Sequence, residues 1–325
     1  KNPSYFIPDP WTDTKSDKSY WNNLISTTLS YFVNKNSEIK FNLKYFFKLI
    51  LIFLKYANFK NYFLYFKLAI TSLKKKWRKA LFLDLLLNDI HLKLFDLKET
   101  KFSNLFLNGI AHIQHHYLFN SKVLNVSQEN PNWYVPDNLD PFKDSLKIYN
   151  KILGDYINNQ NINVMLATGL TQVPYDRVKF YYKLKKHELF FDFFGISFEK
   201  VQELMSRDFI LHFKNRELAA DSFKKIKIIK DNFNLNLFGD IETKENKLFV
   251  SLIYNQEIKN QFIQIKEKKI LLNDYVSFVA IKNGMHSGKG FFYTNNKFQT
   301  IKQNEKIKLN KIKDYIFEFF KKSES

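Results

Sequence analysis

The stretch "PDNLDPFKDSLKIYNKILGDYINNQNINVMLATG", residues 136–169, carries the clearest structural pattern in the chain. Apolar residues recur at helical spacing in residues 136–159, after an Asp-rich start. The apolar run "INVMLATG", residues 162–169, follows and ends in glycine. The first part predicts an amphipathic helix, and the second predicts a buried strand.

A second short apolar run, "FSNLFLNG" at residues 102–109, precedes this helix and also ends in glycine. A strand, a helix and a strand within this length predict a βαβ unit, and such units build parallel sheets. Later apolar runs at residues 247–255 and 275–284 are expected to add strands. The sequence therefore predicts an α/β fold with a mostly parallel sheet flanked by helices.

The chain has a different character before about residue 100. Residues 1–15 are rich in proline and predict an extended segment. From Ser16 to about His91, apolar residues recur at three- and four-residue spacing, which predicts roughly four amphipathic helices with lysine on their outer faces. We therefore expect a helical cap or insertion within residues 1–100 and an α/β core over residues 101–325.

The chain of 325 residues carries a net charge of +19 and has no cysteine. Such a charge favours a phosphate-rich partner or an anionic membrane surface. Alternatively, the positive charge reflects only a lysine-rich composition, because the lysines are spread along the whole chain and arginine is scarce. We recognise no clustered basic stripe with the aromatic motif of an RNA-binding module, so we expect no specific recognition of nucleic acid.

The most apolar region, residues 45–70, is interrupted by lysines. A membrane-spanning helix needs about 20 nearly uninterrupted apolar residues, so we expect no transmembrane segment. The lysine-faced helices of residues 40–95 are able to contact a membrane surface peripherally, or they cover a core and expose lysine to water. The first residue is Lys1 and no signal peptide is visible, so we expect a cytoplasmic chain that is incomplete at its N-terminus.

Chemically capable residues follow three of the apolar runs, in "NGIAHIQHHY", "TGLTQVPYD" and "NGMHSGKGFFY". Ligands of open parallel sheets bind outside the carboxyl ends of the strands. If the three strands are neighbours, one edge of the sheet gathers a set of polar side chains: His112, His115, Thr168, Thr171, Gln172 and His286.

Three histidines fall within five positions of each other. His112 lies three residues before His115 and four before His116, so on a helix each pair shares a face. Two imidazoles at this spacing suit a zinc-like ion if His286 supplies a third ligand. The alternative is that these histidines form hydrogen bonds inside an aromatic core. The three histidines outside this set are expected to be structural or at the surface: His91, His187 and His212.

At these positions the sequence resembles the type I phosphodiesterase/nucleotide pyrophosphatase branch of the alkaline phosphatase superfamily, over roughly residues 100–295. "AHIQHHY" matches the end of the family's Asp-x-x-x-His segment and places His115 on a metal-ligand position. "HSGKGFF" matches a late His-x-x-x-Gly turn and places His286 on another. "VMLATGLTQ" stands where members have a strand that runs into Ser-Asp-His-Gly.

The chain departs from this family in three places. Ala111 stands where the Asp four residues before His115 is expected, the Asp-His pair is absent from "ATGLTQ", and no Ser or Thr nucleophile is recognisable before residue 100. The resemblance therefore implies at most one metal site, with His112 substituting for the lost carboxylate beside His115 and His286.

Two functions follow from the resemblance. The first is a metal-dependent hydrolase of a small-molecule or glycan phosphoester. It would use a divalent ion, expected to be zinc, and Thr168, Thr171 and Gln172 would position the substrate oxygens. The second is a catalytically degenerate member that acts as a binding or assembly protein in surface-glycan metabolism. The missing nucleophile and Asp-His pair favour the second.

Overall fold

The computed structural model describes residues 3–10, 12, 14–34, 42–97, 100–204, 207–295 and 306–324. The chain divides into two compact units, each made of two separate stretches. The first unit comprises Lys1–Lys55 and Asp176–Asn283, and the second comprises Tyr56–Tyr175 and Gly284–Ser325. Residue 100, where the composition changes, lies inside the second unit.

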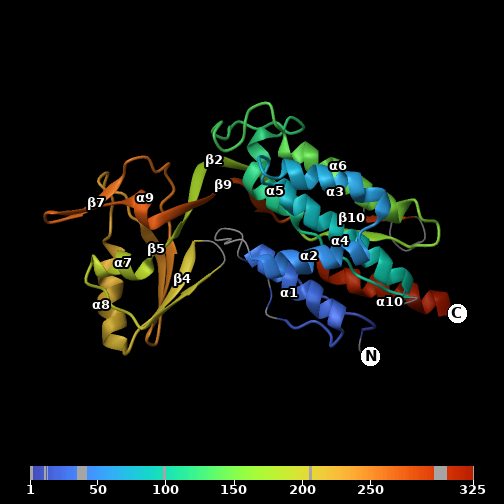
Figure 1. Cartoon of the computed structure of the whole chain (residues 1–325), viewed down its shortest axis with the longest axis horizontal. Coiled ribbons are helices and arrows are strands. Elements are labelled where there is room, and N and C mark those ends of the chain that lie inside the picture. The colour runs from blue at the N-terminus through green and yellow to red at the C-terminus, as the bar shows by residue number, and fades with distance from the viewer. Residues whose placement is uncertain are drawn as a thin grey trace. The chain divides into compact units, whose positions relative to one another are not determined.

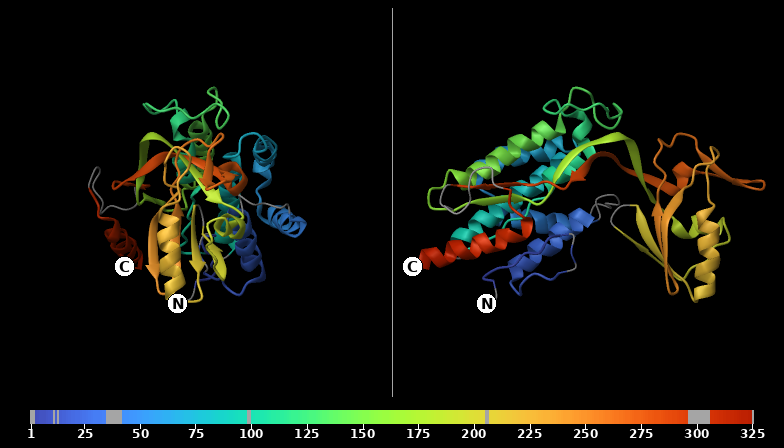
Figure 2. Two further views of the ribbon diagram at one scale, coloured as in Figure 1. Left: turned by 90° about the vertical axis from the view of Figure 1, so that its left-hand side faces the viewer. Right: turned by 180° about the vertical axis from the view of Figure 1, so that it is seen from behind.

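The second unit is mainly helical (Figure 1). Helix α4 (Arg78–Leu97) packs against α3 (Tyr62–Thr71), α5 (Gly109–Tyr117) and α6 (Pro141–Ile157), and α5 also packs against α6. Figure 2 shows these elements from two further sides. The unit also contains 3₁₀ turns and a C-terminal helix: Phe59–Asn61, Leu118–Asn120, Leu309–Lys311 and α10 (Ile312–Glu324).

The core of this unit lies along α4. Leu81, Leu85 and Leu86 are fully buried on this helix. These leucines form the core together with Ile113 of α5 and Ile152 of α6, which are also buried. Burying an aliphatic side chain contributes about 1.5–3 kcal/mol, so each of these residues stabilises the packing of the helices.

The helix predicted for residues 136–159 is confirmed as α6. Asp140 caps it, because its Oδ1 accepts a hydrogen bond from Lys143 N at 2.8 Å, and Pro141 fills the first turn, where its missing N–H is not needed. The helical N-terminal region is also confirmed, with α1 (Tyr20–Asn34) and α2 (Leu43–Tyr56) ahead of α3 and α4.

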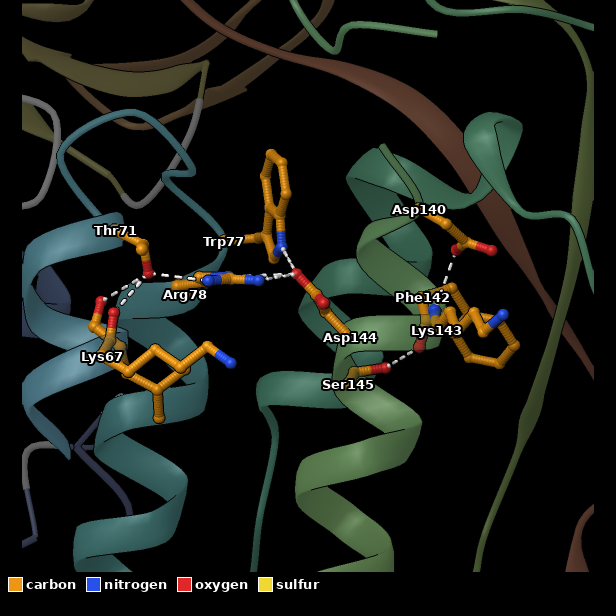
Figure 3. Close-up of polar contacts among 10 residues, drawn as sticks. Lys67, Thr71, Trp77, Arg78, Asp140, Phe142, Lys143, Asp144 and Ser145 are labelled. Atoms are coloured by element: carbon orange, nitrogen blue, oxygen red, sulfur yellow. Dashed lines mark hydrogen bonds and ion pairs between the residues drawn. The ribbon is translucent and has the colours of Figure 1, made fainter. Parts of the chain in front are cut away.

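A polar network joins the end of α3, the start of α4 and the first turn of α6 (Figure 3). Arg78 donates to Asp144 Oδ2 through Nε at 3.0 Å and Nη2 at 2.8 Å, and Trp77 Nε1 donates to the same oxygen at 3.1 Å. Arg78 Nη1 also donates to Thr71 Oγ1 at 2.8 Å. Arg78 of α4 therefore links three helices through its hydrogen bonds to α3 and α6.

A short two-stranded sheet belongs to the same unit. β1 (Met165–Thr168) is the strand predicted at residues 162–169, and it pairs with β10 (Phe291–Thr294). The prediction that this strand is buried is wrong, because three of its four residues are exposed. The pairing is antiparallel, with Met165 opposite Thr294 and Thr168 opposite Phe291. β1 therefore pairs with a strand that lies more than a hundred residues further along the chain.

The first unit holds a four-stranded antiparallel sheet in the order β3 (Lys200–Glu203), β4 (Asp208–His212), β6 (Lys247–Leu252), β5 (Phe238–Lys244). Helix α8 (Arg216–Lys227) contacts β5 and β6. Phe191 of α7 (His187–Asp192) packs on Phe209 and Phe238, with ring centroids 5.9 and 5.7 Å apart. A hairpin of β7 (Phe262–Ile265) and β8 (Lys268–Leu271) leads into α9 (Leu272–Tyr275).

Strands β2 (Thr171–Leu184) and β9 (Val276–Ser287) pair with each other. By sequence, each begins in one compact unit and ends in the other. The start of β2 at Thr171 and the end of β9 at Ser287 belong to the second unit. These two strand ends, more than a hundred residues apart in the chain, therefore lie in the same unit as helices α3 to α6.

The predicted parallel sheet is wrong. Throughout the described residues the sheets are small and antiparallel, with no parallel sheet. The physical reason is that the expected βαβ unit lacks its first strand. Residues 102–108 alternate between exposed and half-buried positions but form no strand ladder, so β1 has no parallel neighbour across α6. The backbone groups of β1 pair instead with β10, which runs antiparallel to it.

Within the described ranges, no helix combines the length and apolarity needed to cross a bilayer.

Candidate functional site

Helix α5 carries the three clustered histidines, and a buried carboxylate on α4 holds its start. Asp84 Oδ2 accepts hydrogen bonds from Gly109 N at 2.9 Å and from the Tyr149 hydroxyl. A side chain at position 109 would not fit, because its Cβ would lie 2.3 Å from Asp84 Oδ2. Gly109 therefore permits the close approach that fixes where α5 begins.

Burial raises the pKa of the Asp84 carboxyl to about 6, against the opposing effect of its hydrogen bonds with Tyr149 and the α5 backbone. The negative charge near the helix N-terminus is favourable because the first backbone N–H groups point at it. Burial beside Asp84 also raises the pKa of Tyr149. The hydroxyl therefore keeps its proton and donates a hydrogen bond to Asp84, while it accepts one from Ile110 N at 3.2 Å.

His115 and His286, which are 171 positions apart in the chain, meet at one point of the second unit. The Nε2 atoms of the two rings are 3.1 Å apart, and the ring centroids are 4.8 Å apart at 66°. His115 lies near the end of α5, where it is half-buried, and His286 lies near the end of β9, where it is exposed. The two imidazoles predicted to share one site therefore face each other directly.

The close contact of β9 with α5 depends on a second glycine. A Cβ at Gly284 would lie 2.5 Å from the backbone oxygen of Gln114 and 2.6 Å from Gln172 Oε1. Side chains two positions apart on a strand point to the same face, so His286 projects toward α5 from the same side as Gly284. Gly284 thus lets the strand press against the helix at the place where His286 reaches His115.

The side chain of Gln172, which was predicted to bind substrate, forms a hydrogen bond within the protein. Its Nε2 donates to the backbone oxygen of Ala111 on α5 at 3.0 Å, and its Oε1 is buried. The side chain lies between α5 and Gly284 of β9. In this arrangement Gln172 positions the two elements that carry His115 and His286.

The two predicted threonines lie at the ends of strands. Thr168 Oγ1 accepts a hydrogen bond from Phe291 N at 2.8 Å, and the residue is exposed at the end of β1. Thr171 begins β2 and is half-buried. Their assignment to substrate oxygens stays a prediction.

His112, predicted as the third ligand, packs against its neighbours on α5. Its ring centroid lies 4.8 Å from that of His116 and 6.4 Å from that of Tyr117. Burial, with a smaller contribution from His115, lowers the pKa of His112 to about 4, so the ring is neutral at neutral pH. Across the described residues, no group of three or more His, Asp or Glu side chains is arranged to hold one metal ion.

Two of the three histidines assigned to structure or surface, His91 and His187, are consistent with a structural role. His91 Nδ1 lies 2.8 Å from the Tyr156 hydroxyl, and its Nε2 lies 2.7 Å from Ser103 Oγ. Burial lowers the pKa of His91 to about 4. His187 is buried, with its ring edge-on to Phe209 at 4.8 Å. Both imidazoles belong to the packing of their units.

The geometry of the His115–His286 pair permits two chemistries. Nitrogen ligands about 2.0–2.1 Å from one zinc ion are about 2.9 to 3.4 Å apart, depending on the bond angle. The 3.1 Å separation of the Nε2 atoms falls in that range. The same separation fits a hydrogen bond in which one ring donates a proton to the other. The pair is thus able either to hold an ion or to share a proton.

Sequence reasoning missed the carboxylate that positions the site. Asp84 lies in the apolar run "LFLDLLLND", where Asp84 and Asn88 are four residues apart and so share a helix face with buried leucines. A polar pair on the apolar face of a helix signals buried hydrogen bonding. The partners of that pair lie on other helices and carry no local signal.

No protein-family model, curated protein or solved structure matches this chain.

Proposed function

We propose that this chain is a metal-dependent hydrolase of phosphate esters in which His115 and His286 hold a divalent ion of the zinc type. The observation that carries the proposal is the 3.1 Å separation of the two Nε2 atoms, contributed by residues 171 positions apart. Both residues had been assigned to ligand positions from short motifs in separate parts of the sequence. Their meeting supports the assignment of these two residues to one site.

The surroundings of the pair also support it. His286 is exposed, so an ion held by the two imidazoles keeps coordination positions open to solvent and to a substrate. A divalent ion in such a position polarises an ester oxygen and lowers the pKa of a bound water molecule. The net charge of +19 favours the approach of an anionic ester.

Each residue of the site has a role in this proposal. His115 and His286 bind the ion through Nε2, while Gln172 and Gly284 hold α5 and β9 together so that the two rings face each other. His112 stays a neutral packing residue beside them. The family resemblance supports the reaction class through His115 and His286 alone. Its fold gives no support, because the described part of the chain contains no parallel sheet.

The test is to titrate the purified chain with zinc by calorimetry and to assay hydrolysis of bis-p-nitrophenyl phosphate. Loss of a residue that hydrogen-bonds to a metal ligand weakens metal binding about 10- to 100-fold. Loss of a ligand itself should cost at least as much, so His115→Ala and His286→Ala should each weaken zinc binding by at least that factor. Each should also abolish hydrolysis. His212→Ala, on β4 of the other unit, is the matched control and should leave both unchanged. Equal zinc affinity in all three variants would refute the proposal.

A second function is favoured by one observation. His115 and His286 form a pair rather than a set of three protein ligands in the described residues, and such a pair is a weak catalytic centre. A catalytically degenerate protein that binds a glycan phosphoester would fit this arrangement. Zinc binding that depends on both histidines, with no turnover of any phosphoester in a panel of nucleotide and sugar esters, would favour this second function.

A further inference from the structure

Helix α3 of the second unit is apolar on two sides. Its inner side buries Tyr65 and Leu68 against α4. Its outer side, with the turns before and after the helix, exposes an apolar stripe: Phe59, Phe63, Phe66, Ile70 and Leu73, between 52% and 82% exposed. A helix that only covered a core would carry polar residues on this side.

The stripe follows the period of the helix. Phe59, Phe66 and Leu73 recur every seventh residue, and Phe63 and Ile70 form a second such series offset by four. Residues at these spacings line one side of a helix. Exposed single apolar residues are common on protein surfaces, but a continuous row of five with three phenylalanines marks an interaction surface.

Lysines run along one edge of this stripe. Lys60, Lys67 and Lys74 recur at the same seven-residue spacing, one position after each residue of the first apolar series, and all three are exposed. The sequence has no carboxylate anywhere between Glu38 and Asp84. The segment that carries the stripe is therefore positively charged and contains no acidic residue, and this charge complements an anionic partner.

We propose that this stripe, with its lysine edge, binds the surface of an anionic lipid bilayer, with α3 lying in the plane of the interface. The apolar side chains enter the boundary between headgroups and acyl chains, and the lysines stay at the level of the anionic headgroups. The inner face of α3 stays packed on α4, so this attachment needs no unfolding.

Two other occupants fit the stripe less well, one because of charge and the other because of the shape of its side chains. A second copy of the chain would bring one lysine edge and a net charge of +19 toward another of the same sign, which opposes association. Single-stranded nucleic acid stacks on aromatic rings within a positive groove. Here Ile70 and Leu73 continue the row beyond the phenylalanines, and aliphatic side chains offer no stacking surface.

The experiment is flotation of the full chain with vesicles of phosphatidylcholine, with and without phosphatidylglycerol, at low and high salt. The chain should float only with the anionic vesicles, and less at high salt. Phe63→Ser with Phe66→Ser should weaken binding at least about tenfold through loss of apolar burial. Lys60→Glu, Lys67→Glu and Lys74→Glu together should weaken it at least about a hundredfold, because each lysine near an anionic surface strengthens attachment about fivefold.

Matched controls lie in the other unit. Phe233→Ser removes an equally exposed phenylalanine, and Lys214→Glu, Lys224→Glu and Lys244→Glu together make the same change in net charge. Both controls should float like the unchanged chain. Circular dichroism confirms that each variant keeps its helices, and all substituted side chains are exposed, so folding should be preserved.

Several outcomes would overturn the proposal. Flotation that falls with the lysine variant but not with the phenylalanine variant would mean simple adsorption of a basic protein. A dimer, seen by light scattering without lipid and dissociated by Phe63→Ser with Phe66→Ser, would assign the stripe to self-association. Binding of a fluorescent oligothymidine that is lost in the same variant, with no flotation, would assign it to nucleic acid.

Discussion

Two buried carboxylates on α4, Asp84 and Asp89, each hold the start of a neighbouring helix, yet they do so with different donors. Asp84 serves α5, the helix of His115, and it accepts from Gly109 N and from the Tyr149 hydroxyl, while a hydrogen bond with the Asn108 backbone also lowers its pKa. The contact is so close that it tolerates no side chain at position 109.

Asp89 serves the start of α3, the helix of the exposed phenylalanine stripe. It accepts from Asn58 N at 2.7 Å, from Asn61 Nδ2 at 2.9 Å and from the Tyr65 hydroxyl at 2.8 Å. Burial raises the pKa of Asp89 against these bonds. Three donors of different kinds therefore converge on one carboxylate.

The difference shows how an apolar helix uses its few polar residues. Asp89 accepts from one backbone N–H and two side chains, whereas Asp84 is bonded to the backbone at the start of α5 and to one hydroxyl and lies in tight steric contact with Gly109. Loss of Asp89 should therefore leave three donors without this acceptor, while the region around Asp84 should be sensitive to protonation and to added volume. The following predictions test that contrast.

The largest effect is expected for Asp89→Ala. The substitution leaves Asn58 N, Asn61 Nδ2 and the Tyr65 hydroxyl without their shared acceptor in a buried place. Unpaired buried donors are costly, so the free energy of unfolding should fall by about 4 kcal/mol. Urea denaturation followed by circular dichroism measures it. Asp96→Ala, on the exposed side of the same helix, should change little, and an equal loss in both variants would contradict the role of Asp89.

The second effect concerns pH. The pKa of Asp84 is raised from 3.8 to about 6 in the folded chain, so between about pH 4 and pH 6 the folded state binds the extra proton. Its contribution to stability is therefore present at low pH and falls by about 3 kcal/mol as pH rises through that window. His91 and His112, with pKa values lowered from 6.5 to about 4, contribute with the opposite sign, because the unfolded chain binds their protons.

Asp84→Asn should remove only the falling contribution. The stability of this variant should then rise more steeply between about pH 4 and pH 6 than that of the unchanged chain, by about 3 kcal/mol. Urea denaturation at a series of pH values measures the difference. Asp96→Asn serves as the control. Parallel stability curves for Asp84→Asn and the unchanged chain would show that Asp84 titrates alike in both states.

The smallest effect is expected for Gly109→Ala. The new Cβ would lie 2.3 Å from Asp84 Oδ2 and 2.9 Å from its Cγ, so the start of α5 must shift. Overpacking of this kind should lower the free energy of unfolding by about 2 kcal/mol. Gly154→Ala is the matched control, since its Cβ meets only Asn158 Nδ2 at 3.5 Å and should stabilise α6 by about 0.5–1 kcal/mol. Stabilisation by Gly109→Ala would contradict the tight fit.

The helices could be predicted because their signals are local. Asp140, Pro141 and the apolar spacing that follows define α6 within one short stretch, and the same periodicity gives α1 to α4. The pairing of β1 could not be predicted. The run at residues 162–169 reads as a buried strand whichever neighbour it has, and its partner β10 carries no local mark of the pairing or its direction.

The candidate site shows the same division between local and long-range information. The residue types and spacing around His115 and His286 predicted one shared site, although the predicted parallel sheet edge that was to bring them together is not formed. No local pattern in the sequence indicated the hydrogen bond of Gln172 to Ala111 or the position of Asp84 at the start of α5. Both depend on which element packs beside which.

The amino-acid sequence by itself determined where most helices form and that the chain is rich in lysine, and it led to the prediction that His115 and His286 share one site. Helix capping and periodicity act over a few residues, so they are readable locally. The tertiary structure alone decided the antiparallel pairing of β1, the buried roles of Asp84 and Asp89, and the exposure of the phenylalanines on α3. Each of these depends on hydrogen bonds or burial between residues far apart in the chain, which no local pattern encodes.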